Sequence, residues 1–230
     1  MSATSSSPDV RRALLLIWSD IPTDREAEFN DWYDREYLRE RVEVPGFIRG
    51  RRFAAISAAP KYLALYEAQS AEVMRSEAYL RLKRTRDAHS MQFIPFFRNT
   101  IKATCDIVSH AGAGEGALLV LLPITVDSER LNAFRDWNLK TFLGELVQST
   151  GVMAATYAVD NNTMHATSAA HDVRTGDRYL ENVILIEAAS DLGASAAMAC
   201  LNPQALERHG VKPHIVEKPC VFRVLYTLRA

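Results

Sequence analysis

One stretch of the sequence occurs twice, and this duplication limits what the chain can fold into. Residues 28–47 (EFNDWYDREYLRERVEVPGF) align without a gap on residues 133–152 (AFRDWNLKTFLGELVQSTGV). The alignment places Trp32 on Trp137 and matches the flanking pattern F-x-D-W in both copies. Tryptophan is a rare residue, so a match in fixed register over this length is hard to obtain by chance. An internal repeat has to be explained by the architecture first, and we interpret it as a duplicated domain.

The first copy predicts the order strand, helix, strand, strand, helix, strand. The apolar run ALLLIW is typical of a strand buried on both faces, and Pro45 must end the first helix. This order is the ferredoxin-like pattern. The expected strands are 13–18, 47–58, 62–68 and 100–108, and the expected helices are 24–43 and 71–86.

The second copy repeats this order. The segments YLALYEAQS and NVILIEAAS share the ending Glu-Ala-x-Ser, which matches Glu67 with Glu187. A long polar insertion such as 160–177 is usually a functional lid or disorder. The expected strands are 117–124, 151–159, 181–188 and 220–228, and the expected helices are 127–150 and 192–209. The predicted divisions are a flexible tail 1–11, repeat one 12–110, a linker 111–115, and repeat two 116–230 with its insertion 160–177.

Each repeat would form a four-stranded antiparallel sheet with helices on one face and an apolar surface on the other. Packing the two sheets together buries both apolar faces. The predicted fold class is therefore α+β, with tandem ferredoxin-like βαββαβ repeats that form an intramolecular α/β barrel. A homodimer through the outer surfaces remains open.

The composition of the chain argues against nucleic acid and membranes as partners. The chain of 230 residues has 48% hydrophobic and 24% charged residues and a formal net charge of −1, which is typical of a soluble globular protein. No global field would attract nucleic acid or an anionic membrane. The three cysteines form no metal-type cluster and fit a reducing compartment. The apolar run 13–18 is too short for a signal peptide or a membrane span, so we expect a cytoplasmic protein.

Three segments resemble the dimeric α/β-barrel superfamily. They are WYDREYLRERVEVPGF, RGRRFAA and PKYLALYEA, and the resemblance is closest to EthD-like and duplicated members. The family pattern is W-Y-x-x-x-H followed by P-G-F, and this chain has Tyr37 at the histidine position. The superfamily includes cofactor-free monooxygenases, muconolactone-type isomerases, polyketide cyclases and haem enzymes. The resemblance therefore implies the barrel fold but does not select a reaction.

The first helix of repeat one carries candidate catalytic residues. At 100° per residue counted from Phe29, Glu36 falls on the face that must cover the sheet, and Tyr37 lies at about 80°. A carboxylate there would be partly desolvated, which raises its pKa and suits general acid or base chemistry. The second copy has Thr141 and Phe142 at these positions, so repeat one is the preferred location. The alternative interpretation is an ion pair between Glu36 and a nearby arginine.

Further candidates lie outside this helix. His89 precedes an aromatic run and would titrate near neutrality, although it is equally consistent with an exposed loop. Strand alternation places Phe47, Arg49 and Arg51 on one face of 47–58 and Arg52 on the other. Arginine is well suited to holding a carboxylate or phenolate, with a surface ion-pair stripe as the alternative. The predicted catalytic residues are Glu36, His89 and Tyr37, and the predicted substrate-binding residues are Arg51, Arg52, Tyr66, Tyr62, Trp18 and Tyr33.

The preferred function is a cofactor-independent enzyme that acts on a small aromatic or hydrophobic metabolite. Decarboxylation, carbon–carbon cleavage and double-bond migration need only a base, an acid and an anion stabiliser, so lyase or isomerase chemistry is expected. No H-x-x-x-H, HExxH, GxGxxG, Walker A or G-x-S-x-G motif occurs, and we expect no cofactor and no metal. Two alternatives stay open: a non-catalytic EthD-like ligand-binding or accessory protein, and a haem- or oxygen-dependent oxidoreductase.

Overall fold

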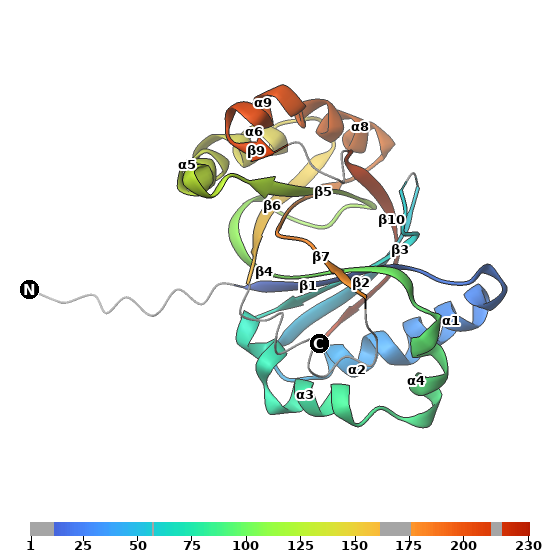
Figure 1. Cartoon of the computed structure of the whole chain (residues 1–230). Helices are drawn as coiled ribbons and strands as arrows, with labels where there is room; N and C mark the ends of the chain where they lie inside the picture. The colour runs from blue at the N-terminus through green and yellow to red at the C-terminus, as the bar shows by residue number, and fades with distance from the viewer. Residues whose placement is uncertain (1–11, 57, 162–175, 213–217) are drawn as a thin grey trace, which may run out of the picture.

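Two layers of helices enclose a curved sheet in the computed structural model of the chain (Figure 1). The structure describes residues 12–56, 58–161, 176–212 and 218–230. The predicted tail 1–11 and most of the predicted insertion 160–177 lie outside the described residues.

The four predicted strands of each repeat are present in the predicted order, whereas repeat two has two additional two-residue strands and each predicted helix is divided into shorter segments. The strands are β1 (Ala13–Asp20), β2 (Phe47–Ala55), β3 (Tyr62–Ala68), β4 (Arg98–Gly112), β5 (Leu118–Val126), β6 (Val152–Asp160), β7 (Arg178–Tyr179), β8 (Asn182–Ala188), β9 (Val211–Lys212) and β10 (Cys220–Arg229). The α-helices are α1 (Glu26–Trp32), α2 (Leu38–Val42), α3 (Glu77–Arg84), α4 (Ala88–Phe93), α5 (Leu131–Trp137), α6 (Leu143–Val147), α8 (Asp191–Cys200) and α9 (Pro203–Arg208). Short 3₁₀ segments lie at Thr23–Arg25, Ala71–Arg75, Ile94–Phe96 and Ser128–Arg130.

The two repeats join edge to edge into a closed barrel. The first repeat has the strand order β4-β1-β3-β2 and the second has β6-β8-β5-β10, all in antiparallel pairs. Pairing of β2 with β10 and of β4 with β6 closes the ring. The predicted tandem ferredoxin-like barrel is confirmed. Figure 1 shows the helices of repeat one on one side of it and those of repeat two on the other.

The sequence of β1 is apolar over residues 13–18 because both faces of this strand are buried. Leu14, Leu16 and Trp18 point into the barrel, whereas Leu15 and Ile17 pack against the helices. A strand buried on both faces reads as a continuous hydrophobic run. Full burial of each such leucine or isoleucine stabilises the fold by about 1.5–3 kcal/mol relative to exposure. The barrel interior is thus a packed core along most of its length.

A π-helical turn interrupts the first helix of each repeat. It covers Tyr33–Tyr37 in repeat one and Asn138–Phe142 in repeat two, at positions that the sequence alignment equates. A π turn contains more residues than an α turn, so each residue rotates by less than 100° and the helix face shifts. Tyr37 is therefore buried, and the side chain of Glu36 is 44% exposed. The prediction that Glu36 faces the sheet is wrong for this reason.

A β-bulge changes the predicted faces of β2. The register with β3 shifts between Phe47 and Arg49, because one strand accommodates an extra residue there. Phe47 consequently packs on the helix side against Tyr66, while Arg49 lines the barrel interior. The expectation that Phe47 shares a face with Arg49 and Arg51 is corrected accordingly.

Candidate functional site

Two of the predicted catalytic residues contact each other on the outer surface of repeat one. Helix α4 places Nδ1 of His89 2.8 Å from Oε2 of Glu36. The His89 ring also meets the edge of Phe93 with 5.2 Å between centroids. Both polar side chains are about half exposed. This carboxylate–imidazole pair lies in solvent rather than in a pocket among the described residues.

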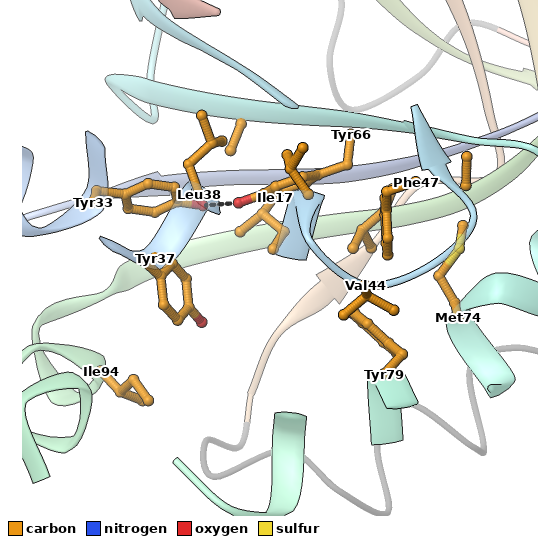
Figure 2. Packing of buried hydrophobic residues seen from close by; sticks show 14 of the residues in the cluster. Ile17, Tyr33, Tyr37, Leu38, Val44, Phe47, Tyr66, Met74, Tyr79 and Ile94 are labelled. Atoms are coloured by element: carbon orange, nitrogen blue, oxygen red, sulfur yellow. Dashed lines mark hydrogen bonds between the residues drawn. The ribbon is translucent and has the colours of Figure 1, made fainter. Parts of the chain in front are cut away.

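The predicted tyrosines belong to the core between the helices and the sheet. The Tyr66 hydroxyl donates to the Tyr33 hydroxyl over 3.3 Å, and both side chains are buried (Figure 2). Burial raises the pKa of both groups, so they remain protonated at neutral pH. The hydroxyl of Tyr37 accepts a 2.8 Å hydrogen bond from Nη2 of the buried Arg41. These side chains fill the layer in which Tyr37 was expected to meet a substrate.

The side chain of Arg52 also lies buried between the helices and the sheet. It is 1% exposed and donates 2.8 Å hydrogen bonds to Asp34 and to Asn30. Its guanidinium lies 4.2 Å from the centroid of the Tyr33 ring, and Tyr62 packs on the same group while donating to a carboxylate of α1. Arg52 therefore holds helix α1 to the sheet.

A cavity opens at the end of the barrel where β1 and β5 begin, and we call it the barrel mouth. Its volume is about 380 Å³, within the usual range of small-molecule sites. Apolar residues from the barrel wall form part of its surface, and most of the remainder is polar or charged. Its lining comprises Arg12, Leu14, Ile48, Arg49, Leu65, Glu67, Ile107, His110, Gly114, Glu115, Thr156, Leu185, Glu187 and Arg229. Trp18 lies elsewhere, packed against Phe222 with its indole NH donated to the Pro60 carbonyl.

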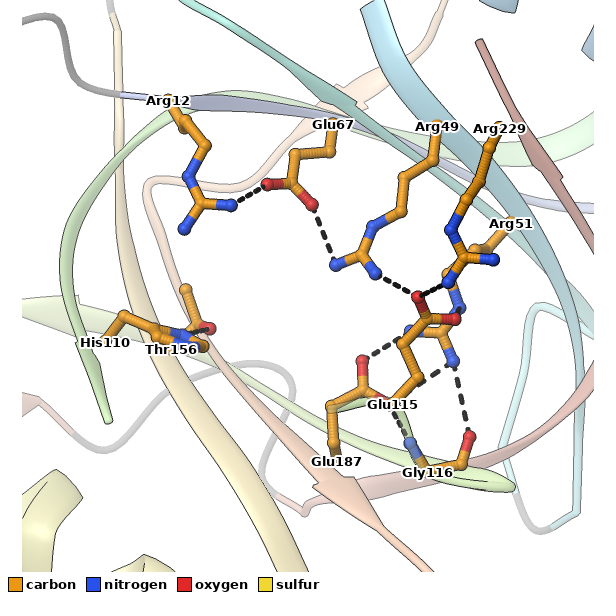
Figure 3. A network of polar contacts seen from close by, with 10 residues as sticks. All are labelled: Arg12, Arg49, Arg51, Glu67, His110, Glu115, Gly116, Thr156, Glu187 and Arg229. Atoms are coloured by element: carbon orange, nitrogen blue, oxygen red, sulfur yellow. Dashed lines mark hydrogen bonds and ion pairs between the residues drawn. The ribbon is translucent and has the colours of Figure 1, made fainter. Parts of the chain in front are cut away.

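Two strand carboxylates anchor the charges of the barrel mouth (Figure 3). Glu67 accepts from Arg12 at 2.6 Å and pairs with Arg49 at 2.7 Å. Glu187 accepts from Arg51 at 2.5 Å. Arg51 is 2% exposed, and charge-assisted pairs of this kind are stronger than neutral hydrogen bonds. The predicted substrate-binding residue Arg51 therefore lies at the barrel mouth, apart from the other predicted site residues.

A third carboxylate comes from the connection between the repeats. Glu115 accepts from Arg49 at 2.5 Å and also from Arg229, and Nε of Arg51 lies 3.7 Å from its second oxygen. Burial alone would raise the pKa of Glu115, but the guanidinium groups of these three arginines outweigh it and lower the pKa. Glu115 is therefore ionised at neutral pH.

His110 is the titratable group on the opposite wall of the cavity. Its Nδ1 lies 2.9 Å from Oγ1 of Thr156, and its ring is exposed to the cavity that it lines. Burial lowers the pKa of His110 below its ordinary value of 6.5, and the positive charge of Arg12 lowers it further. The imidazole is therefore neutral at neutral pH and can accept a proton.

At the barrel mouth the two repeats carry different residues at equivalent positions. Glu67 and Glu187 occupy equivalent places, since Leu14 and Leu119 of the two first strands pair with them. The residues around them differ: the equivalent pairs are Arg49/Ala154, Arg51/Thr156 and Arg229/Gly112. One half of the mouth thus carries the positive charges, and smaller side chains on the other half leave room for the cavity beside His110.

The sequence analysis did not single out Arg12, His110, Glu115 or Arg229 as site residues. They come from the two ends of the barrel strands and from the inter-repeat connection, so only the closed barrel brings them together. A signal was present in the repeated Glu-Ala-x-Ser ending, because an ionisable residue kept at a buried strand position in both copies needs a partner.

Comparisons with known proteins support the fold. No family model and no curated protein matches the chain. An anthrone oxidase-like protein is similar in structure, with a TM-score of 0.60, 12% identity, and 96% of this chain and 94% of that chain covered. A chlorite dismutase from Candidatus Nitrospira defluvii has a TM-score of 0.54 and 9% identity, with 95% of this chain and 92% of that chain covered. A haem-binding protein from Thermus thermophilus has a TM-score of 0.51 and 10% identity, with 94% of this chain and 92% of that chain covered. The chain shares their duplicated α+β barrel.

No described helix is long and apolar enough to cross a membrane. In the part of the chain that the structure covers, no group of three or more histidine, cysteine, aspartate or glutamate side chains converges as metal ligands would.

Proposed function

We propose that the protein is an enzyme that moves a proton at a carbon atom of a small metabolite bound in the barrel mouth. The observation that supports this is a cavity of about 380 Å³ that is lined by a neutral histidine and three arginines. A perturbed titratable group in a concave site with convergent polar groups is typical of active sites. The reaction class remains the lyase or isomerase type expected from the sequence, but its location moves to the barrel mouth.

The roles follow from the chemistry of the side chains. Neutral His110 would accept the proton, with its orientation set by Thr156. Removal of a proton from carbon leaves a negative charge that spreads onto an adjacent oxygen. Arginine side chains of the lining that are fixed by ion pairs, such as Arg12 and Arg49, would stabilise that charge without reorganising. The apolar wall, which includes Leu14 and Leu65, suits the hydrophobic part of a substrate.

Replacing His110 by asparagine should strongly slow proton transfer. The probes are phenylpyruvate, benzoylacetate and the neutral ketone phenylacetone, with hydrogen–deuterium exchange followed by proton NMR in D₂O. We expect the native protein to accelerate exchange of at least one probe and His110→Asn to slow it by about 10²–10⁴-fold, the usual contribution of a general base. Because the pKa of His110 is lowered, the native rate should fall as the pH decreases, with its half-maximal value below pH 6.5.

His89→Asn is the matched comparison, since it removes a histidine that is paired on the outer surface. It should keep the native exchange rate. Loss of exchange with His89→Asn but not with His110→Asn would return the site to the helix surface. Binding of a probe without any exchange would instead favour the non-catalytic EthD-like role.

A haem- or oxygen-dependent oxidoreductase is the second candidate, because the chlorite dismutase and the haem-binding protein have this fold. Two of the three described histidines are committed to other contacts, and the third, His110, is the base proposed above. His209 stacks flat on Trp137 with 3.8 Å between ring centroids, and His89 is hydrogen-bonded to Glu36. Buried side chains fill the layer between helices and sheet in both repeats. His165, His171 and His214 lie outside the described residues. The protein as purified should show no Soret band, and a Soret band would overturn the proposal.

A further inference from the structure

We propose that the arginines around Glu115 are a carboxylate-binding subsite, and that Glu115 occupies it until a substrate carboxylate takes its place. This inference rests on the proposed function and names its substrate class: a small monocarboxylate with a short apolar or aromatic body. Glu115 differs from the other two carboxylates of the barrel mouth in where it lies in the chain.

Glu67 and Glu187 are fixed parts of the barrel wall. Both lie within strands at equivalent positions, and their partners are arginines that each carboxylate holds in place. Glu187 also accepts a 2.8 Å hydrogen bond from the backbone NH of Gly116. Glu115 instead belongs to the connection between β4 and β5, which has no counterpart in the repeat.

Three guanidinium groups converge on this one connecting residue. Arg49 and Arg229 donate to the same oxygen of Glu115, and Arg51 approaches the other oxygen. Figure 3 shows the carboxylate lying below the Arg49 and Arg229 side chains. Without Glu115, Arg49, Arg51 and Arg229 would lose the carboxylate that they share, and only Glu67 and Glu187 would remain beside them. An uncompensated positive charge in this partly buried place requires an anion, and planar guanidinium groups match a carboxylate especially well.

The connection allows Glu115 to leave. A Cβ atom at Gly114 would meet no atom within 4 Å, and this glycine has a φ of +94°, which other residues rarely adopt. A Cβ atom at Gly116 would lie 2.2 Å from the carbonyl oxygen of Ala188, so that side of the connection is fixed. Glu115 therefore follows a glycine with open space around it and precedes one packed against the Ala188 backbone, and its side chain is 23% exposed. Rotation about Gly114 can carry the carboxylate into solvent.

The space beside Glu115 fits the apolar part of such a ligand. The same cavity contains Leu14, Ile48, Leu65, Ile107 and Leu185 next to the arginines. A carboxylate on Arg49 and Arg229 would place its body over these side chains and toward His110. A neutral analogue of the same shape would gain the apolar contacts but would not compete with Glu115 for the arginines.

Isothermal titration calorimetry with benzoate and its neutral analogue benzamide tests the inference. Glu115→Ala and Glu115→Gln should each lower the Kd of benzoate by about tenfold or more, because the competing carboxylate is gone. The Kd of benzamide should change by less than about twofold. Adding Arg229→Ala to Glu115→Ala should remove most of the gain. Glu72→Ala, which removes an exposed carboxylate paired with Arg75, is the control for net charge and should match the native protein.

Benzoate affinity that does not rise in either Glu115 variant would overturn the inference, as would an equal gain for benzamide or no benzoate binding to any form. If Glu115→Ala does not fold, Glu115→Gln gives the answer, since it keeps the side-chain size. These outcomes are separate from the proposed function, whose failure is seen as proton exchange that does not depend on His110.

Discussion

Replacing Arg51 by methionine is expected to lower the free energy of unfolding by about 3–5 kcal/mol. Arg51 is 2% exposed and donates to both oxygens of Glu187, at 2.5 and 3.3 Å, and to the Gly116 carbonyl. The variant leaves the Glu187 carboxylate, whose side chain is 13% exposed, without its cationic partner. A buried charge without a partner costs far more than the pair contributes when intact. Urea denaturation at neutral pH measures the loss.

Two further variants separate this effect from a general loss of packing. Adding Glu187→Gln to Arg51→Met should recover a large part of the stability, because the unpaired charge is then removed. Arg35→Met breaks an ion pair with Asp31 whose side chains are 75% and 64% exposed, and it should leave the stability close to that of the native protein, because an exposed pair contributes little. Equal losses for Arg51→Met and Arg35→Met would contradict the buried network at the barrel mouth.

Phe222→Ala is the second substitution with a large expected effect, a loss of about 3–5 kcal/mol in the free energy of unfolding. Phe222 is fully buried inside the barrel and packs edge-on against Trp18 with 5.5 Å between ring centroids. Its removal leaves a cavity that the closed ring of strands cannot collapse to fill. The measurement is again chemical denaturation, with binding of a dry apolar probe such as benzene as a second readout.

The duplicated fold supplies a matched control for this prediction. Cys105 pairs with Leu14 as Phe222 pairs with Leu119, so the two residues occupy equivalent places in the barrel. Cys105→Ala removes a single buried sulfur atom and should cost much less. A loss below about 1 kcal/mol for Phe222→Ala would show that the barrel interior is not a packed core.

The fold was predictable because its evidence is local and occurs twice. The repeat at Trp32 and Trp137 and the apolar strand 13–18 were enough to give the element order and the closed barrel. The helix phase was not predictable, since the π turn that exposes Glu36 leaves no mark in the hydrophobic spacing. The two-residue alternation of side chains along a strand likewise gives no sign of the bulge that places Phe47 and Arg49 on different faces of β2.

The candidate site was only partly predictable. The sequence selected Arg51, and it placed His89 and Glu36 as proton carriers without placing them together. The barrel mouth could not be predicted from local patterns, because Arg12, Glu115 and Arg229 come from opposite ends and the middle of the chain. Their meeting depends on pairing between β2 and β10, a contact between the repeats that neither repeat encodes alone.

A crystal structure of the native protein soaked with benzoate tests the central claim most directly, that the working site is the barrel mouth. The account predicts benzoate in the mouth, its carboxylate on Arg49 and Arg229, its ring against the apolar wall, and Glu115 turned away. Benzoate bound between the helices and the sheet beside Tyr37, with Glu115 still on its arginines, would contradict it.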